Sequence, residues 1–396
     1  MKYLFFTTLV LSSFQLFAQC DGRYEDEIFS EVSKTIIEYT DVYDWSAFDT
    51  GLEMDVYQAV GDTATNRPLI VFAHGGAYVA GNKNNPAMIS LCEAFARRGY
   101  VTASIQYRLT SSANLISPNA SSIFTQTVLN SVSDMKAAVR YFRKDVEENN
   151  NFFGINPDLI FAGGYSAGAV TSAHLSMIDE DQVPDVFQSF FEEAGGIEGN
   201  SGNPGYSSEV SGAILLAGAI NTTDYIDVDD VPIVSVHAVD DNTVNYECAN
   251  ALGNSNLPYL CGSGEIHETL ENLGLVNELY TFQSGGHTAP ILNLDNIVVP
   301  FISEFLYNLI CVTTSVKEAP KNNFNIYPNP CQNVLNIESV DTDNDEVIVS
   351  NLVGQVLMQL ELARGTNKVS VSHLKKGAYL ITTNKPNSNK QLFVKN

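Results

Sequence analysis

The chain has 396 residues, 44% of them hydrophobic, and a formal net charge of −25 at pH 7. Its length exceeds one average domain and its apolar content suffices for a sizeable core, so we expect two folded domains. The acidic excess argues against nucleic-acid binding, because phosphates need cationic partners, and favours a protein that stays dispersed in solution.

Residues 1–19 have the features of a cleaved signal peptide. Lys2 precedes a short apolar run, and the small residue Ala18 stands near its end. The segment is too short for a membrane span, and no other stretch approaches the ~18 uninterrupted apolar residues that a transmembrane helix requires. Lipidation of Cys20 is an alternative, although Gln19 fits poorly before a lipidated cysteine. We expect an exported protein with no transmembrane segment.

A buried strand is predicted at residues 68–73, and it runs directly into His-Gly-Gly-Ala-Tyr at residues 74–78. A glycine pair lets the main chain approach a ligand closely, and backbone N–H groups aimed at a developing oxyanion stabilise it. We therefore interpret Gly75, Gly76 and Ala77 as part of an oxyanion hole. An ordinary glycine turn after a strand is the alternative.

The following segments alternate between strand and helix. Residues 101–105 read as a strand, and apolar residues recur at steps of three and four over residues 128–146, which predicts a long amphipathic helix. We interpret the apolar stripe of this helix as core packing. Further strands are predicted at residues 212–217 and 231–234. This alternation predicts a mostly parallel sheet flanked by helices.

Residues 164–168 read Gly-Tyr-Ser-Ala-Gly and lie between an apolar run and a stretch of small residues. This order predicts a strand, a sharp turn and a helix start, with Ser166 at the apex as the nucleophile. The N–H of Ala167 would be a further oxyanion donor. The motif alone is weak, since a chain of this length matches it by chance about one time in eight.

A long insertion at residues 179–210 follows the predicted helix, and long connections at such a place often overhang an active site. Its aromatic residues are Phe187, Phe190, Phe191 and Tyr206. They either line a pocket or pack the insertion onto its own domain, and the sequence leaves both open. Tyr78 and Tyr165 adjoin the oxyanion loop and the serine, so we expect both to bind substrate.

A serine hydroxyl becomes a good nucleophile only when a base accepts its proton. Among six histidines, His287 is the best placed, on a glycine-rich loop after a strand predicted at residues 278–282. His237 ends another strand and is interpreted as structural. The acid that orients the base is Asp240 or Asp241, and spacing alone does not separate these neighbours.

The six cysteines allow fifteen complete pairings, and the sequence does not choose among them. We favour Cys248 with Cys261, which bracket a short insertion, and Cys20 with Cys92. Free buried thiols are the alternative. No Cys or His spacing suggests a metal, and no cofactor is expected.

The composition changes near Lys321, because nearly all of the negative charge precedes it. Residues 313–322 read as a polar linker, and residues 323–396 as a small domain of short strands separated by turn residues, which predicts an all-β, Ig-like sandwich. The expected strands lie at residues 334–337, 347–349, 355–360, 368–371 and 379–382.

The first part of the chain resembles the α/β-hydrolase superfamily of esterases and lipases, most closely its carboxylesterase, feruloyl-esterase and formamidase-like branches. The resemblance covers residues 20–312 and rests on residues 74–78, 106–109, 164–168, 237–241 and 286–287. It implies an α/β-hydrolase fold and puts the acid at Asp241, with Asp240 in reserve. Such enzymes often carry a glycine where this chain has Ala238.

The tail closely resembles the C-terminal sorting domain of type IX secretion cargo. The resemblance rests on residues 327–330, 351–356, 374–381 and 393–395. It implies recognition by the type IX secretion machinery, export across the outer membrane of a Gram-negative bacterium, and a secreted or cell-surface protein. An Ig-like binding module is the alternative.

These observations predict a secreted serine hydrolase that cleaves carboxylic esters with Ser166, Asp241 and His287 through an acyl-enzyme. Small-molecule esters, or acetyl and feruloyl esters on polysaccharides, are the expected substrates, the latter by analogy. The alternatives are an amidase or peptidase of the same fold, formamidase-like or prolyl-peptidase-like, and a non-catalytic surface adhesion module.

Overall fold

The computed structural model describes residues 20, 22–42, 51–183, 185–312, 324–339, 345–351, 356–383 and 390–396. The chain divides into two compact units, Met1–Thr314 and Ser315–Asn396, and each is described by itself. The predicted signal peptide at 1–19 and the predicted linker at 313–322 lie outside the described residues.

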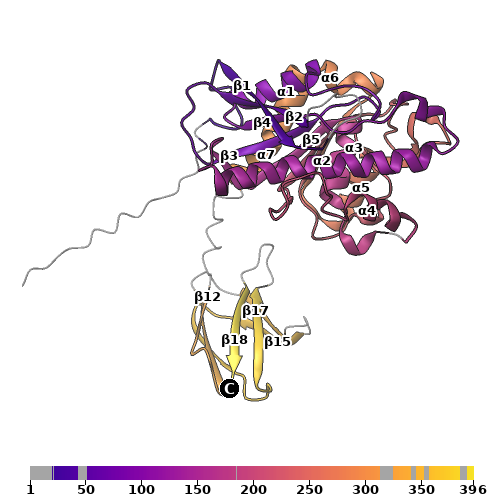
Figure 1. Cartoon of the computed structure of the whole chain (residues 1–396). Coiled ribbons are helices and arrows are strands. Elements are labelled where there is room, and N and C mark those ends of the chain that lie inside the picture. Colours follow the sequence, from indigo (N-terminus) through magenta and orange to yellow (C-terminus); the bar gives the residue numbers. More distant parts are fainter. Residues whose placement is uncertain are drawn as a thin grey trace, which may run out of the picture. The chain divides into compact units, whose positions relative to one another are not determined.

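An eight-stranded sheet forms the centre of the first unit (Figure 1). Its spatial order is β1-β2-β4-β3-β5-β6-β8-β11, and the neighbouring strands from β4 to β11 are parallel, whereas β1 and β2 form an antiparallel edge. The strands are β1 (Val32–Thr40), β2 (Leu52–Ala59), β3 (Arg67–Ala73), β4 (Val101–Ile105), β5 (Ile155–Tyr165), β6 (Gly212–Leu216), β8 (Ile233–Ala238) and β11 (Asn277–Phe282). The predicted mostly parallel sheet is confirmed, and the antiparallel edge adds to it.

Helices cover both faces of this sheet. Alternate residues of β6 separate the two faces: Leu215 packs in a cluster with α3 and α5, whereas Ile214 and Leu216 pack with α1 and α7. The long helix α2 covers the same face as α3 (Figure 1). The helices are α1 (Pro86–Arg97), α2 (Ala120–Glu148), α3 (Ala167–Met177), α4 (Gln188–Ala194), α5 (Ser263–Leu273), α6 (Ala289–Leu292) and α7 (Val299–Tyr307).

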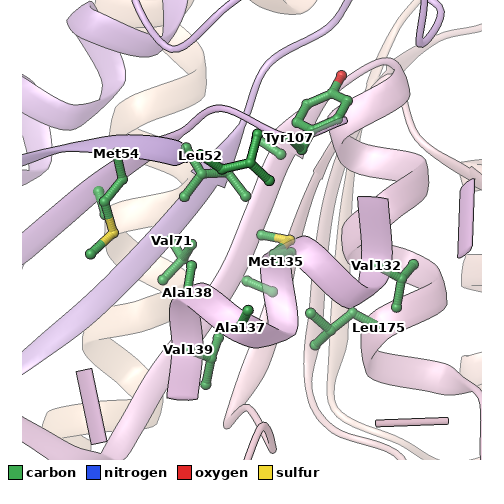
Figure 2. Close-up of a cluster of buried hydrophobic side chains, with 14 of the residues drawn as sticks. Leu52, Met54, Val71, Tyr107, Val132, Met135, Ala137, Ala138, Val139 and Leu175 are labelled. Carbon is green, nitrogen blue, oxygen red and sulfur yellow. The ribbon is translucent and has the colours of Figure 1, made fainter. Parts of the chain in front are cut away.

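Figure 2 shows how α2 packs on the sheet. Its side chains Met135 and Ala138 lie in the same buried cluster as Leu52 of β2 and Val71 of β3. Residues three and four apart share one face of a helix, which is why the apolar period in the sequence predicted this element. Burying a side chain the size of methionine stabilises the fold by about 1.5–3 kcal/mol.

The turn between β5 and α3 requires glycine at two positions. A Cβ atom at Gly168 would lie 2.0 Å from the carbonyl oxygen of Ala73, and one at Gly164 would lie 2.3 Å from the carbonyl carbon of Gly168. Any side chain there would push α3 away from β3 and β5. The start of α3 is therefore held tightly against the ends of these strands.

The last helical segment of this unit, Leu294–Cys311, is long and apolar enough to cross a membrane by length and composition alone. Half of that window is buried, and Ile302 and Leu306 pack in the same cluster as α1. Core helices of soluble proteins have the same features, so this segment is weak evidence for a membrane span.

Two disulfides link four of the five cysteines of the first unit. Cys248 is bonded to Cys261, as predicted, and Cys20 is bonded to Cys311. The predicted pairing of Cys20 with Cys92 is therefore wrong. Cys92 faces the sheet from α1 as a free thiol within an apolar cluster, and burial raises its pKa. Cys331 is also a free buried thiol.

The second unit consists of two antiparallel sheets around their own core. One sheet has the order β12-β13-β16 and the other β15-β14-β17-β18. The strands are β12 (Phe324–Tyr327), β13 (Val334–Ser339), β14 (Asp345–Asn351), β15 (Val356–Leu362), β16 (Gly365–Ser370), β17 (Gly377–Thr383) and β18 (Lys390–Lys395). Ile337 from the first sheet and Ile381 from the second lie in one buried cluster. The predicted all-β sandwich is confirmed.

Candidate active site

Three loops at one edge of the large sheet bring Ser166, Asp241 and His287 together. Ser166 follows β5, Asp241 lies three residues beyond the end of β8, and His287 lies on the loop after β11. Because these strands are parallel, their carboxyl ends share one edge, where open α/β sheets bind ligands.

Ser166 occupies the apex of the turn between β5 and α3. Its backbone has φ 56° and ψ −120°, a conformation that is costly for a residue with a side chain and is held only by its surroundings. The backbone N–H donates to the carbonyl oxygen of Leu216, 2.8 Å away, which fixes the turn to β6. Only 6% of Ser166 is exposed.

The imidazole of His287 lies between the serine and the acid. Its Nδ1 is 2.7 Å from Asp241 Oδ2, and because a carboxylate only accepts, Nδ1 carries the proton. Nε2 is then free to accept from the hydroxyl of Ser166, whose Oγ is 2.8 Å away. The hydroxyl of Tyr165 donates to the carbonyl oxygen of His287 at 3.1 Å, and the two rings lie 5.2 Å apart.

Asp241 is held as a carboxylate by several donors. Its Oδ2 also accepts from Nε2 of the fully buried His237 at 3.2 Å, and its Oδ1 accepts from the backbone N–H groups of Thr243 and Val244. Burial raises the pKa of Asp241, but the hydrogen bonds from His237 and His287 and the charge of His287 more than offset this, so the net pKa lies well below its usual value.

Asp240 contacts a different part of the histidine loop. Its carboxylate accepts from the backbone N–H of Gly285 at 3.1 Å and from that of Gly286 at 2.8 Å. Of the two neighbouring carboxylates, Asp241 contacts the imidazole itself, whereas Asp240 holds the backbone that carries it. His237, interpreted from sequence as structural, also contacts Asp241, and its position at the end of a strand gave no signal for this.

The loop after β3 provides backbone groups beside Ser166. Gly76 has φ 134°, and a Cβ atom there would lie 1.9 Å from the carbonyl oxygen of Ala80, so the loop path requires glycine. Among the described residues, the N–H groups of Gly76, Ala77 and Ala167 donate to no backbone carbonyl oxygen. These three groups are therefore available to an anionic oxygen.

Two tyrosines fix this loop. Tyr78 donates its hydroxyl to the carbonyl oxygen of Ala167 at 2.8 Å, which ties the loop to the start of α3. Tyr107 stacks on His74 with 4.3 Å between the ring centroids and donates to the carbonyl oxygen of His74 at 2.7 Å. The residues at 74–78 and 106–109 thus form one packed support. A Cβ atom at Gly75 would lie 2.8 Å from Cδ1 of Tyr165 and 3.1 Å from Cβ of Ser166, so a side chain there would crowd both residues.

A mostly apolar cavity of about 300 Å³ opens beside Ser166. Its wall comes from the Tyr78 loop, α2, α3, the insertion around α4, and the hairpin closed by the Cys248–Cys261 disulfide. The lining residues are Ala77, Tyr78, Ser121, Phe124, Thr125, Val128, Leu129, Ser166, Ala167, Val170, His174, Ile178, Phe187, Phe191, Asn221, Tyr225, Thr243, Val244, Ala251, Leu252, Leu257, Pro258, Tyr259 and Leu260.

The two tyrosines that we expected to bind substrate differ in position. Tyr78 lines the cavity, whereas Tyr165 packs against His287 and is absent from the lining of this cavity among the described residues. Phe187 and Phe191 of the insertion line the cavity, but Tyr206 donates to Glu148 at 2.5 Å.

The cavity also includes residues that the sequence did not single out. Val128 of α2, interpreted as core packing, is part of its wall, together with Val170 and His174 of α3. A residue that lines a cavity has the same helical spacing as a residue that packs in the core. Only the three-dimensional structure distinguishes the two roles. Within the described ranges, no group of three or more His, Cys, Asp or Glu side chains is arranged to hold a metal ion.

Two family models match separate parts of the chain. Residues 54–201 match BD-FAE, and residues 325–395 match the secretion system C-terminal sorting domain. The first match covers the β3 loop and Ser166, and the second covers most of the β-sandwich unit.

Individual relatives match over shorter stretches. Gut esterase 1 of Caenorhabditis briggsae is 30% identical over 115 residues, which are 28% of this chain and 18% of that protein. Lipase 1 of Yarrowia lipolytica (strain CLIB 122 / E 150) is 30% identical over 125 residues, which are 31% of this chain and 24% of that protein. The chain therefore matches less than a quarter of the length of these curated relatives.

A solved structure is similar over most of the first unit. Thermogutta terrifontis esterase 2 phosphonylated by sarin has a TM-score of 0.50, is 20% identical, and covers 70% of this chain and 95% of that chain. At this identity the likeness bears on the fold alone.

Proposed function

We propose that this chain, an α/β-hydrolase with a BD-FAE domain and a type IX secretion sorting domain, is an exported serine esterase that acts through Ser166, Asp241 and His287. The observation that carries the proposal is the continuous series of hydrogen bonds from Ser166 Oγ through both nitrogens of His287 to Asp241. A hydroxyl, an imidazole and a carboxylate in this order generate a nucleophile at neutral pH.

Acylation begins when Ser166 Oγ attacks the ester carbonyl carbon. Its proton passes to Nε2 of His287, and the resulting imidazolium is stabilised by the carboxylate of Asp241. The carbonyl oxygen becomes an oxyanion, which the N–H groups of Gly76, Ala77 and Ala167 bind. The carbon–oxygen bond to the leaving group then breaks, and His287 gives its proton to the departing alcohol.

Deacylation uses the same groups in reverse. A water molecule donates a proton to His287 as its oxygen attacks the acyl carbon, the oxyanion returns to the same N–H groups, and Ser166 leaves as a hydroxyl after taking the proton back. Asp241 stays ionised throughout, in keeping with its lowered pKa. The reaction needs no metal or redox cofactor for its atoms and electrons to balance.

The acyl group occupies the cavity beside Ser166. A volume of about 300 Å³ is much larger than an acetyl group and matches the lower range of ligand pockets, which supports an aryl or medium-chain acyl group, feruloyl esters included. The sorting domain directs the protein out of the cell by type IX secretion, to the surface or the extracellular space. Esters on extracellular polysaccharides are therefore accessible substrates.

The decisive experiment assays the purified protein on aryl esters of increasing acyl length, on acetylated and feruloylated glycans, and on matched anilides. We expect ester hydrolysis and a loss of about 10³-fold or more in turnover for Ser166→Ala. An unchanged rate in Ser166→Ala rejects this nucleophile. Activity on the anilides alone moves the assignment to an amidase, and inactivity on every substrate favours the adhesion module.

A further inference from the structure

His237 is a fully buried polar residue on the face of β8 that α5 covers. Ile233 of the same strand packs in one cluster with Ile266 and Leu270 of α5, and alternate residues of a strand share a face. The hydroxyl oxygen of Ser263, the first residue of α5, lies 2.9 Å from Nδ1 of His237. His237 is absent from the described residues that line the cavity, so it can affect the chemistry only through another residue.

The contacts of this ring define where its proton lies. Nε2 of His237 is 3.2 Å from Oδ2 of Asp241 and 2.9 Å from the carbonyl oxygen of Val244, and both oxygens only accept. Nε2 therefore carries the proton of the neutral ring. Nδ1 accepts from the hydroxyl of Ser263, whose other acceptor, the carbonyl oxygen of Gly218, is farther away at 3.4 Å. Ser263 thus fixes the tautomer in which His237 donates to Asp241.

The carboxylate of Asp241 is shared between two imidazoles. Its Oδ2 is 2.7 Å from Nδ1 of His287 and 3.2 Å from Nε2 of His237, while its Oδ1 accepts from the backbone N–H groups of Thr243 and Val244. No Lys or Arg in the described part of the chain forms an ion pair with Asp241, which is paired with these two histidines. The charge of Oδ2 is therefore divided between the base and His237.

We propose that His237 is a positioning residue for ester hydrolysis, which orients the carboxylate of Asp241 and limits how strongly that carboxylate holds the proton of His287. This inference rests on the proposed ester hydrolysis at Ser166. A carboxylate with one donor fewer concentrates its charge on the bond that remains, so loss of the His237 N–H makes Asp241 hold the His287 proton more tightly. The hydrogen-bonded series has five members, from Ser166 through both histidines and Asp241 to Ser263.

The electrostatics of Asp241 support this role. Burial raises the pKa of Asp241, and the hydrogen bond from His237 is the largest of the effects that oppose burial, ahead of the contacts with His287. The net pKa lies well below its usual value. A donor with so large a share of the stabilisation of the carboxylate also changes what the carboxylate offers to His287.

The other titratable side chains around this pair come from three elements. Burial, and then the charge of Asp241, raise the pKa of Tyr165 to about 12, so Tyr165 stays neutral. Asp240 accepts from the backbone of the histidine loop. The ring of Tyr246 lies edge-on to His237 with 5.7 Å between the centroids. The hydroxyls of both tyrosines bond elsewhere, so the proton held between acid and base responds chiefly to His237.

Two amide variants separate the contact with Asp241 from the contact with Ser263. The amide of glutamine reaches as far as Nε2 of a histidine, so His237→Gln keeps an N–H donor for Asp241. The amide of asparagine reaches only as far as Nδ1, so His237→Asn keeps a partner for Ser263 and loses the donor to Asp241. For both variants, kcat and kcat/KM on a soluble aryl ester are measured from pH 5 to 9. If His237→Asn does not fold, His237→Leu, which also lacks the donor, takes its place.

We expect His237→Asn to lower kcat at pH 8 by about 10-fold, as loss of one hydrogen bond to a charged group does. The midpoint of the acidic limb of kcat/KM is expected to rise by about half a pH unit or more, because the more strongly held proton keeps the base unavailable to a higher pH. His237→Gln is expected to stay close to the unaltered protein in both. The sign is decisive, since a merely loosened Asp241 would stabilise the imidazolium less and move the midpoint down.

Tyr246→Phe is the matched control, because it keeps the ring beside His237 and removes a hydroxyl that lies 3.1 Å from Oγ1 of Thr281. It is expected to lower the unfolding temperature and to leave the midpoint in place. Equal midpoints in His237→Asn and His237→Gln, a downward shift in His237→Asn, or an equal upward shift in Tyr246→Phe each overturns the inference. Failure of the unaltered protein to hydrolyse any ester refutes the proposed function instead, so the two failures are distinguishable.

Discussion

Asp240 and Asp241 are adjacent in the chain, yet they hold the histidine loop at different points. Asp241 accepts from Nδ1 of His287, and Asp240 accepts from the backbone N–H groups of Gly285 and Gly286. The side-chain contact fixes the orientation of the imidazole and would stabilise its charged form, whereas the contacts of Asp240 fix the backbone of the loop. We therefore expect removal of the two carboxylates to have different effects on the rate of ester hydrolysis.

Replacing each of them by asparagine measures this difference. We expect Asp241→Asn to lower kcat on an aryl ester by about 10³- to 10⁴-fold, because an amide favours the wrong tautomer of His287 and does not stabilise the imidazolium. Asp240→Asn retains an acceptor oxygen for the loop and is expected to lower kcat on the same ester by about 10-fold or less. Equal losses in the two variants would contradict the assignment of Asp241 as the acid.

The Cys248–Cys261 disulfide closes the hairpin that forms one wall of the cavity. This hairpin, β9 (Cys248–Asn250) and β10 (Tyr259–Gly262), contributes Ala251, Leu257 and Leu260 to the lining. The Cys248→Ser/Cys261→Ser double variant is expected to lose about 3 kcal/mol of stability, as a short cross-linked loop does. It should also lose more activity on hexanoyl than on acetyl esters.

The Cys20→Ser/Cys311→Ser double variant is the control for this experiment. It removes a cross-link of the same unit between residues that do not line the cavity. Thermal unfolding should detect destabilisation in both double variants, while the hexanoyl-to-acetyl ratio changes only in the first. A change of that ratio in both would show a general loosening of the unit.

Gly168 is expected to tolerate no side chain. In Gly168→Ala the added carbon would meet the backbone of Ala73 at 2.0 Å, so α3 must move away from β3. We expect the free energy of unfolding to fall by more than about 3 kcal/mol, which is within the range of the most damaging single substitutions, and the yield of soluble protein to be low. Gly196→Ala is the comparison, since an added carbon there meets nothing within 4 Å and only its φ of 76° is unfavourable. Similar unfolding temperatures in the two variants would contradict the steric argument.

Asp230 makes stability depend on pH in an unusual direction. Burial and the nearby carboxylates of Asp227, Asp179 and Asp229 raise the pKa of Asp230 to about 7, against a hydrogen bond from the backbone of Asp227. The folded protein thus keeps a proton that the unfolded chain releases near pH 4. The contribution of this bound proton to the free energy of unfolding is fully present below about pH 4 and is lost as the pH rises through 7.

Asp230→Asn should remove this dependence. Relative to the unaltered protein, the variant is expected to gain about 1 kcal/mol at pH 8, a value already reduced for solvent screening, and less at pH 5. Melting temperatures measured from pH 5 to 8 test this. Asp224→Asn removes an exposed carboxyl from the same region and controls for net charge, and an identical pH profile for both variants would refute the role of Asp230.

The strands and the long helix that were predicted from local sequence patterns are present in the structure. The apolar runs became β3, β4, β5, β6 and β8, and the period of three and four became α2, because these patterns report the periodicity of one segment. The loops that carry Ser166, Asp241 and His287 could be placed because parallel strands end at one sheet edge. Whether Asp240 or Asp241 meets the imidazole depends on loop geometry, which adjacent positions do not reveal.

Features that depend on long-range contacts could not be predicted. Cys311 was not matched to Cys20, because nothing local shows that the two ends of the unit lie together. The cavity combines α2, α3, the insertion around α4 and the β9–β10 hairpin, and an apolar residue such as Val128 has the same helical spacing whether it faces a neighbour or a cavity. The antiparallel edge formed by β1 and β2 was likewise not predicted.

The bond between Cys20 and Cys311 joins the first described residue of the hydrolase unit to a residue at its end. Since synthesis and export proceed from the amino terminus, this cross-link can form only after almost the whole unit has entered an oxidising compartment. Maturation of this unit therefore has a late covalent step. Once formed, that bond also ties the two ends of the first unit together, so a cut between this unit and the sorting domain would leave the ends of the first unit cross-linked.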